Sequence, residues 1–287
     1  MTIRLKENCR YALVVPSSMG VRITPVNRQP VHTALLYDMQ VTSAETNVLN
    51  VPAALGLPVK VLTNFVAGSP IAALIKSELH ARHIDYEGKE FDQGGPWGYR
   101  HQFNIADSGY GLRGPRVQND RAGEVGRLLN VRDFDLDRIF GREGVQILHL
   151  SGLIGALSPQ TGEFCLELAR AAKKHGTVIS FDLNYRASFW KNRESELHAI
   201  FSEIASISDI LIGNEAGNVL MAGRGHNIVD GGAGLDVARF IGESVHYTVD
   251  HVGGAMTVTS HTLAGGGTDI LYNVELLRFE DQVVLTR

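Results

Sequence analysis

Five polar residues follow buried strands of this chain, at positions where bound ligands are usually found. The apolar runs 146–150, 177–181 and 209–212 alternate with segments 159–175 and 194–207, whose apolar residues have helical spacing. This alternation predicts parallel strands joined by right-handed crossovers. Ligands of such open sheets bind beyond the carboxyl ends of the strands. The polar residues expected there are Asp182, Asn184, Arg186, Asn214 and Glu215.

The first part of the chain has a different pattern. Residues 43–56 predict a capped helix that ends at a glycine, 59–64 a strand, and 71–83 a second helix. Residues 87–118 alternate glycines, aromatic residues and polar residues. Because long loops of this kind usually carry function, we interpret this segment as a small β lid over the open end of the sheet.

Composition excludes several classes of protein. The 287 residues are 44% hydrophobic and carry a formal net charge of −4, which suits one large globular domain or two small ones. The absence of a basic run argues against nucleic acid as a partner. No apolar run approaches the roughly 20 residues that span a bilayer, and the N-terminus lacks a signal-peptide pattern. The two cysteines have neither redox nor metal-ligand spacing, so a cytoplasmic protein is expected.

Three segments resemble the ribokinase-like (PfkB) carbohydrate kinases, most of all the 2-keto-3-deoxygluconate kinases. They are the stretch from SAETNVLNVPAALG to ARHID (43–85), FDLNYRASFW (181–190) and DILIGNE (209–215). The resemblance implies a three-layer α/β/α fold with a mostly parallel sheet and a small β lid. It implies one domain over 1–287, with lid segments near 11–42 and 86–121 and a divergent part at 216–287.

The resemblance also implies a reaction. This is the ATP-dependent phosphorylation of a primary hydroxyl of a sugar or sugar acid, most of all 2-keto-3-deoxygluconate, with Mg²⁺ bridging the phosphates. The sugar would contact Glu45 and Asn47 at the start of a helix, and Arg121 would face a sugar carboxylate. Two alternatives stay open here: Ser43 and Glu45 cap the helix, and Arg121 is a surface arginine in a polar turn.

On the nucleotide side, the resemblance assigns phosphate contacts to Asn184 and Arg186, and it assigns water and Mg²⁺ to Asn214 and Glu215. Simpler interpretations are a salt bridge between Asp182 and Arg186, and a helix that begins at Asn214 and Glu215.

In the family, a glycine-rich turn forms an anion hole and opens a helix, and an Asp in it acts as the base that takes the proton of the sugar hydroxyl. This chain has no exact match to that motif. The best approximation is Gly265-Gly266-Gly267-Thr268-Asp269, with Gly265 and Gly267 as phosphate contacts and Asp269 as the base; a second, 232–236, lies too close to Glu215. The extra residue before Asp269 motivates an alternative function: an inactive relative that binds a sugar acid or nucleotide as a sensor or scaffold. By analogy with the family, a homodimer through the lid is expected.

Overall fold

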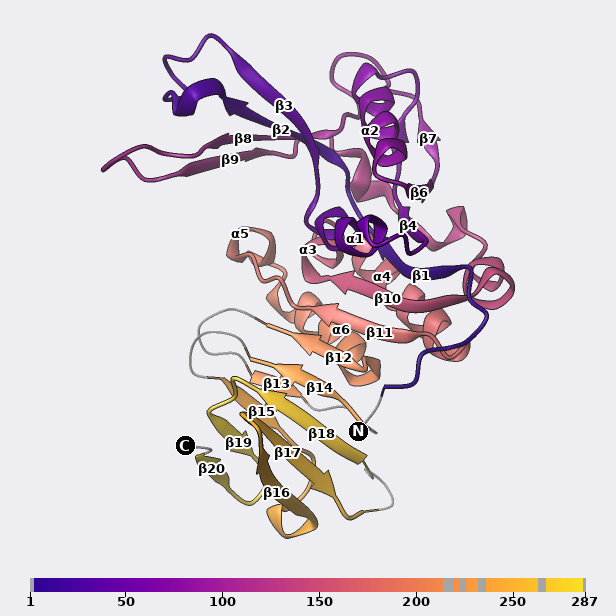
Figure 1. Cartoon of the computed structure of the whole chain (residues 1–287), viewed down its shortest axis with the longest axis vertical. Helices are drawn as coiled ribbons and strands as arrows, with labels where there is room; N and C mark the ends of the chain where they lie inside the picture. Colours follow the sequence, from indigo (N-terminus) through magenta and orange to yellow (C-terminus); the bar gives the residue numbers. More distant parts are fainter. Residues whose placement is uncertain (1–2, 214–218, 222–225, 232–235, 263–266, 286–287) are drawn as a thin grey trace. The chain divides into compact units, whose positions relative to one another are not determined.

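The computed structural model describes residues 3–213, 219–221, 226–231, 236–262 and 267–285. The chain divides into two compact units (Figure 1). Unit 1 consists of Met1–Arg10 and Leu136–Arg287, and unit 2 consists of Tyr11–Asp135. Each unit is described by itself below.

Unit 2 contains parallel strands covered by helices. β1 (Tyr11–Pro16) pairs with β4 (Val59–Leu62), which pairs with β6 (Ile84–Glu87). β1 and β4 are almost wholly buried, as expected of strands that are covered on both faces. α1 (Ala44–Ala54) and α2 (Pro70–Ala81) contact these strands, and α2 turns its buried residues Ala72, Ile75 and Leu79 inward.

Unit 2 has a second sheet, whose strands come from the two segments that the sequence analysis assigned to a lid; we call this sheet the lid. Its order is β3 (Tyr37–Thr42), β2 (Gly20–Pro25), β8 (Gln102–Asp107) and β9 (Arg116–Asp120). Figure 1 shows it as two long paired ribbons, indigo for β2 and β3 and magenta for β8 and β9. The short strands β5 (Phe65–Val66) and β7 (Glu90–Phe91) pair beside α2, and the 3₁₀ turns Val26–Arg28, Val125–Leu128 and Val131–Asp133 connect the rest.

Unit 1 is built on a mixed sheet. Parallel neighbours run in the order β10 (Val145–Ser151), β11 (Val178–Asp182), β12 (Ile210–Ile212), β14 (Ile228–Asp230) and β18 (Gly267–Tyr272). β17 (Ala255–Ser260) and β16 (Tyr247–Val252) continue it in antiparallel pairing. The predicted strands at 146–150, 177–181 and 209–212 are confirmed.

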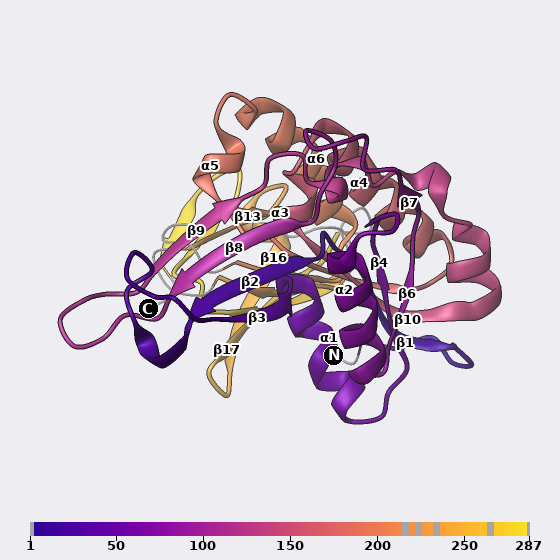
Figure 2. The ribbon, with the colours of Figure 1, turned by 90° about the horizontal axis from the view of Figure 1, so that it is seen from above.

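Helices α4 (Pro159–Lys174) and α6 (Glu194–Ile207) cover this sheet and pack against each other, as Figure 2 shows. Ser158 caps α4 by accepting a hydrogen bond from the backbone N–H of Thr161. The rings of Phe181 in β11 and Phe201 in α6 pack edge to face, with their centroids 5.4 Å apart. Shorter helices are α3 (Gly152–Gly155), α5 (Ala187–Trp190), a π-helical turn (Asp137–Gly144) and a 3₁₀ turn (Ser244–His246). None of the described helices is long and apolar enough to cross a membrane.

The last part of unit 1 forms strands where the family pattern calls for helices. β13 (Val219–Met221), β15 (Val237–Arg239), β19 (Leu276–Arg278) and β20 (Val283–Leu285) make a separate sheet in that order. Gly267–Tyr272 is strand β18, so the glycine run of this chain leads into a strand, whereas the glycine turn of the family opens a helix. The β-branched and aromatic residues of this segment favour a strand.

Candidate functional site

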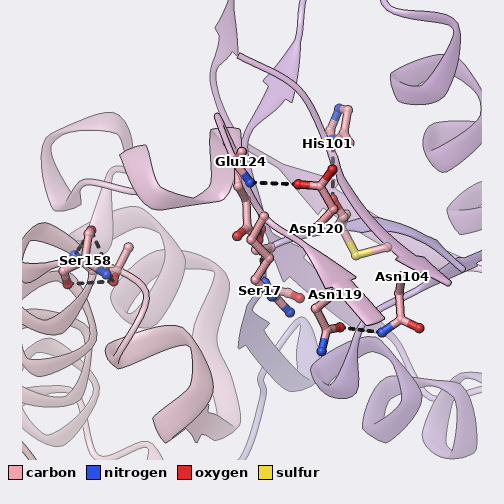
Figure 3. Close-up of polar contacts among 12 residues, drawn as sticks. Ser17, His101, Asn104, Asn119, Asp120, Glu124 and Ser158 are labelled. Carbon is pink, nitrogen blue, oxygen red and sulfur yellow. Dashed lines mark hydrogen bonds and ion pairs between the residues drawn. The ribbon is translucent and has the colours of Figure 1, made fainter. Parts of the chain in front are cut away.

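Two neighbouring serines follow the carboxyl end of β1, and each binds a buried carboxylate. The Ser17 hydroxyl donates to Oε2 of Glu45 at 2.8 Å, and the Ser18 hydroxyl donates to Oε1 of Glu124. Glu45 is 1% exposed and Glu124 is 2% exposed. Because buried carboxylates need donors nearby, these hydroxyls stabilise charges that would otherwise be costly in the interior. We call these four residues the serine–glutamate cluster; Figure 3 labels Ser17 and Glu124.

The elements of unit 2 fix Glu45 in this position. Ser17 extends the ladder between β1 and β4, since its backbone N–H donates to the carbonyl of Leu62 at 2.9 Å. Ser43 caps α1 by accepting the N–H of Thr46 at 3.0 Å, and Glu45 lies in the first turn. The positive end of the helix dipole favours a carboxylate there. The cap is thus made by Ser43, while Glu45 reaches the end of β1.

Glu124 joins the cluster to Arg121. Nη1 of Arg121 donates to Oε1 of Glu124 at 2.6 Å, and the side chain of Glu124 is wholly buried. Oε2 of Glu124 is also buried and has no hydrogen-bond partner among the described residues. The structure therefore brings the predicted residues Glu45 and Arg121 into one network, which runs from Glu45 through Ser17 and Ser18 to Glu124 and Arg121.

A glycine makes room for this network. A β-carbon on Gly126 would stand 2.0 Å from the Ser18 hydroxyl oxygen and 3.0 Å from its α-carbon. The first neighbour can rotate, but the second belongs to the backbone that follows β1. Only glycine lets the turn Val125–Leu128 approach Ser18 this closely.

We expect Gly126→Ala to lower the free energy of unfolding by about 1–3 kcal/mol, because an extra methyl group forces this contact apart. Urea unfolding of the variant beside wild type measures the change. Gly56→Ala is no suitable control, because Gly56 has a φ of +78°; Ala73→Gly in α2 reports the ordinary cost of a helix substitution, about 1 kcal/mol. Equal stability of Gly126→Ala and wild type would contradict the packing described here.

Polar side chains of the lid lie beside the cluster. Nη2 of Arg100 bonds Oδ1 of Asp120 at 2.5 Å, and Nδ2 of Asn104 donates to Oδ1 of Asn119 at 2.6 Å, a bond that Figure 3 shows between labelled residues. The imidazole of His101 is buried between the lid and β5. Its two ring nitrogens contact the carbonyl of Met19 at 3.1 Å and the N–H of Val66 at 3.3 Å, and burial lowers its pKa. His101 is thus a neutral structural side chain.

Asn47 is not a member of the serine–glutamate cluster, and three members of the cluster were missed by the sequence interpretation. The side chain of Asn47 is on the exposed side of α1, while its N–H donates to the carbonyl of Ser43 at 3.2 Å. Ser17, Ser18 and Glu124 were not among the predicted residues. The two serines follow a buried strand, so the rule that selected Asp182 also points to them.

In unit 1, the predicted residues after β11 form a tight turn. Nδ2 of Asn184 donates to the Ser151 hydroxyl at 3.1 Å, and its N–H donates to Oδ1 of Asp182 at 2.9 Å. Asn184 has a φ of +36°, a conformation that Asn tolerates better than most residues. Burial raises the pKa of Asp182, opposed by the Asn184 N–H and the positive charge of Arg186. Arg186 itself is exposed and donates to the carbonyl of Tyr185 at 2.8 Å.

Asp269 lies elsewhere in unit 1. Its Oδ1 accepts the N–H of Asn227 at 2.8 Å and Nδ2 of the same residue at 2.7 Å, and burial raises its pKa to about 6. The strand register runs from Asp182 through Ile212 and Asp230 to Tyr272. Asp269 precedes Tyr272 by three residues, about 10 Å along a strand. The structure therefore does not bring Asp269 together with Asp182 and Asn184.

The other predicted residues are divided between described and undescribed parts. Gly267 is the first residue of β18. Asn214, Glu215 and Gly265 lie outside the described residues. Within the described residues, no group of three or more His, Cys, Asp or Glu side chains could hold a metal ion. The Mg²⁺ assignment therefore depends on Glu215 and stays a prediction.

Comparison with other proteins adds sequence relatives, although no family model matches the chain. Over 103 residues it is 38% identical to a 5-dehydro-2-deoxygluconokinase of Clostridium perfringens, covering 36% of this chain and 29% of that protein. Over 205 residues it is 24% identical to a 2-dehydro-3-deoxygalactonokinase of Haloferax volcanii, covering 71% and 60% respectively. The chain thus spans less than two thirds of either relative.

Solved structures share the fold. A PfkB family carbohydrate kinase from Listeria grayi matches with a TM-score of 0.61 and 26% identity, over 70% of this chain and 59% of that one. A 2-dehydro-3-deoxygluconokinase from Thermotoga maritima matches with a TM-score of 0.64 and 23% identity, over 71% of this chain and 60% of that one. A sugar kinase from Pyrococcus horikoshii in complex with ATP matches with a TM-score of 0.58 and 16% identity, over 72% of this chain and 63% of that one. The predicted ribokinase-like α/β fold and the resemblance to PfkB carbohydrate kinases are confirmed.

Proposed function

We propose that this chain is part of a kinase that transfers the terminal phosphoryl group of ATP to a hydroxyl of a sugar or sugar acid. The observation that carries the proposal is the network from Glu45 to Arg121 at the end of β1. It gathers carboxylate and hydroxyl groups, which are chemical types that can hydrogen-bond to sugar hydroxyls, with one guanidinium. The ribokinase-like fold and the kinase names of the sequence relatives support the same reaction.

As the substrate we propose 2-keto-3-deoxygluconate, phosphorylated at its primary hydroxyl. Three of the proteins described above are named as kinases of dehydro-deoxy sugar acids, whose molecules carry a ketone, hydroxyls and a carboxylate. In this proposal Arg121 contacts the carboxylate, and Glu45 and Asn47 contact hydroxyls. A guanidinium suits a planar carboxylate because it offers parallel N–H donors.

We propose Mg²⁺–ATP as the phosphoryl donor; it would supply an activated phosphoryl group and a cation that neutralises the charge developing on it. The turn after β11 fits a polyphosphate, since Asn184 is held by Ser151 and Arg186 is exposed. Arg186, Asn184 and the glycines Gly265 and Gly267 would contact phosphates, and Asn214 and Glu215 would hold the hydrated metal. Asp269 remains the proposed base; its raised pKa, about 6, suits proton transfer near neutral pH.

A homodimer through the lid is a further part of the proposal. The lid exposes large apolar side chains that a partner surface would cover: Leu35 (92% exposed), Leu36 (71%), Met39 (48%) and Val117 (58%). Apolar surface of this kind often marks an interaction site.

We expect Asn184→Ala to raise the KM for ATP about tenfold with little change in the KM for sugar, because its amide would lose its contact with phosphate. Initial-rate kinetics with each substrate varied in turn measure the split. Asn192→Ala, in the turn before α6, is the matched control. A variant whose KM for ATP equals that of wild type would remove Asn184 from the nucleotide site.

The proposed function is tested by coupled ADP release with purified protein, Mg–ATP and a panel of 2-keto-3-deoxygluconate, fructose and ribose. ADP release that depends on a sugar supports a kinase. A chain that is stabilised thermally by a sugar acid but releases no ADP would instead support the inactive sensor or scaffold.

A further inference from the structure

A second charge lies directly against the guanidinium that the proposed function assigns to the substrate carboxylate. The side chain of Glu124 is fully buried, and its Oε1 accepts hydrogen bonds from both Arg121 and Ser18. The buried carboxylate is therefore committed to this position, and its negative charge is poorly screened by solvent. Any charged ligand group that binds Arg121 therefore also interacts electrostatically with the negative charge of Glu124.

The backbone around Glu124 holds this arrangement in place. The N–H of Val125 donates to the carbonyl of Arg100 at 2.9 Å, and the N–H of Arg100 donates to the carbonyl of Gly123 at 2.8 Å. Gly126 packs against Ser18 on the other side. The backbone on both sides of Glu124 is thus held in place, and its carboxylate is held by the hydrogen bonds from Ser18 and Arg121.

The charges of the network do not favour an anionic ligand strongly. Glu45 and Glu124 are both buried carboxylates, and Arg121 is the cation that the network contains. The exposed pair of Arg100 and Asp120 is neutral as a unit. A sugar carboxylate at Arg121 would approach Glu124 as well, and two like charges close together repel. A neutral sugar hydroxyl at the same place meets no such penalty.

We propose that Glu124 is a specificity-determining residue that offsets the charge of Arg121, so that the site accepts neutral sugars nearly as well as sugar acids. The inference rests on the proposed function and adds to it the range of substrates. It assigns the discrimination to a residue that contacts Arg121 rather than the sugar. Removing the negative charge at residue 124 should therefore sharpen the preference for sugar acids.

The test is isothermal titration calorimetry of the full chain with 2-keto-3-deoxygluconate and with fructose, which carry a carboxylate and a hydroxymethyl group, respectively, next to the ketone. Glu124→Gln should raise the ratio of the two affinities, acid over neutral, by about tenfold, mainly through tighter binding of the acid. Glu78→Gln is the matched control, because Glu78 pairs with Arg82 in α2 of the same unit. Its ratio should equal that of wild type.

Glu124→Met, an uncharged side chain of similar length, is a second variant in case one of the two does not fold. An unchanged ratio in a folded variant that still binds sugars would overturn the inference and leave the proposed function standing. Wild-type protein that binds neither sugar would contradict the proposed function itself, and the inference with it.

Discussion

Replacing Arg121 by alanine is expected to lower kcat/KM for 2-keto-3-deoxygluconate about a hundredfold while the KM for ATP stays unchanged. The reason is the loss of a charged hydrogen-bond donor to the substrate carboxylate, which typically weakens binding by 2–5 kcal/mol (roughly 30-fold to several thousandfold). Initial-rate kinetics with each substrate varied separately measure the effect.

The single variant has a second consequence that the design must separate. Without Arg121, the charge of Glu124 loses its cationic partner, which costs about 3–5 kcal/mol of stability. The double variant Arg121→Ala, Glu124→Gln removes both charges and is the informative protein for kinetics. Arg82→Ala, which breaks the more exposed pair with Glu78, is the matched control. A folded double variant whose kcat/KM for the sugar acid equals that of Glu124→Gln alone would exclude Arg121 from the substrate site.

Asp269→Asn is expected to remove a pH dependence of stability. Burial raises the pKa of Asp269 from 3.8 to about 6, so the folded chain holds this proton at pH values where the unfolded chain has lost it. Asp269 makes its full contribution to the free energy of unfolding below pH 4. This contribution, up to about 3 kcal/mol, is lost as the pH rises through 6. Urea unfolding between pH 4 and 7 measures the fall; the variant should lack it, apart from the change that other groups produce.

The same variant tests the sequence prediction that Asp269 is the base. Loss of turnover with unchanged KM values would support that role, since an amide accepts no proton from the sugar hydroxyl. Retained turnover would show that another residue is the base. That result would agree with the strand register, in which Tyr272, and not Asp269 three residues before it, is aligned with Asp182. Asp250→Asn, on the exposed strand β16, controls for the loss of one negative charge in unit 1.

Local sequence patterns predicted much of the fold. Apolar runs located β10, β11 and β12, helical spacing located α4 and α6, and the glycine-rich, aromatic segment indicated the antiparallel pair β8 and β9. These features depend on residues close together in the chain, where periodicity reports burial directly. The segment after Gly267 was assigned no helix or strand from the sequence, and the structure shows that it forms β18, in keeping with the strand propensity of Thr268 and Ile270.

The candidate site was less predictable because it is made by distant residues. Ser18 and Glu124 are separated by 106 positions, and only the folded lid brings them together. Glu124 follows a glycine in a polar turn, and no local pattern marks it as buried. Arg121 and Glu45 could be proposed through the family resemblance, whereas the carboxylate that offsets Arg121 required the structure.

Phosphorus NMR of the reaction mixture tests the central claim most directly. With the chain, Mg–ATP and 2-keto-3-deoxygluconate, we expect a phosphomonoester resonance to appear as ADP forms, in equal amounts, with splitting by the two protons of a primary carbon. ATP that stays intact with every sugar of the panel, or ADP that forms with free phosphate and no phosphosugar, would contradict the account.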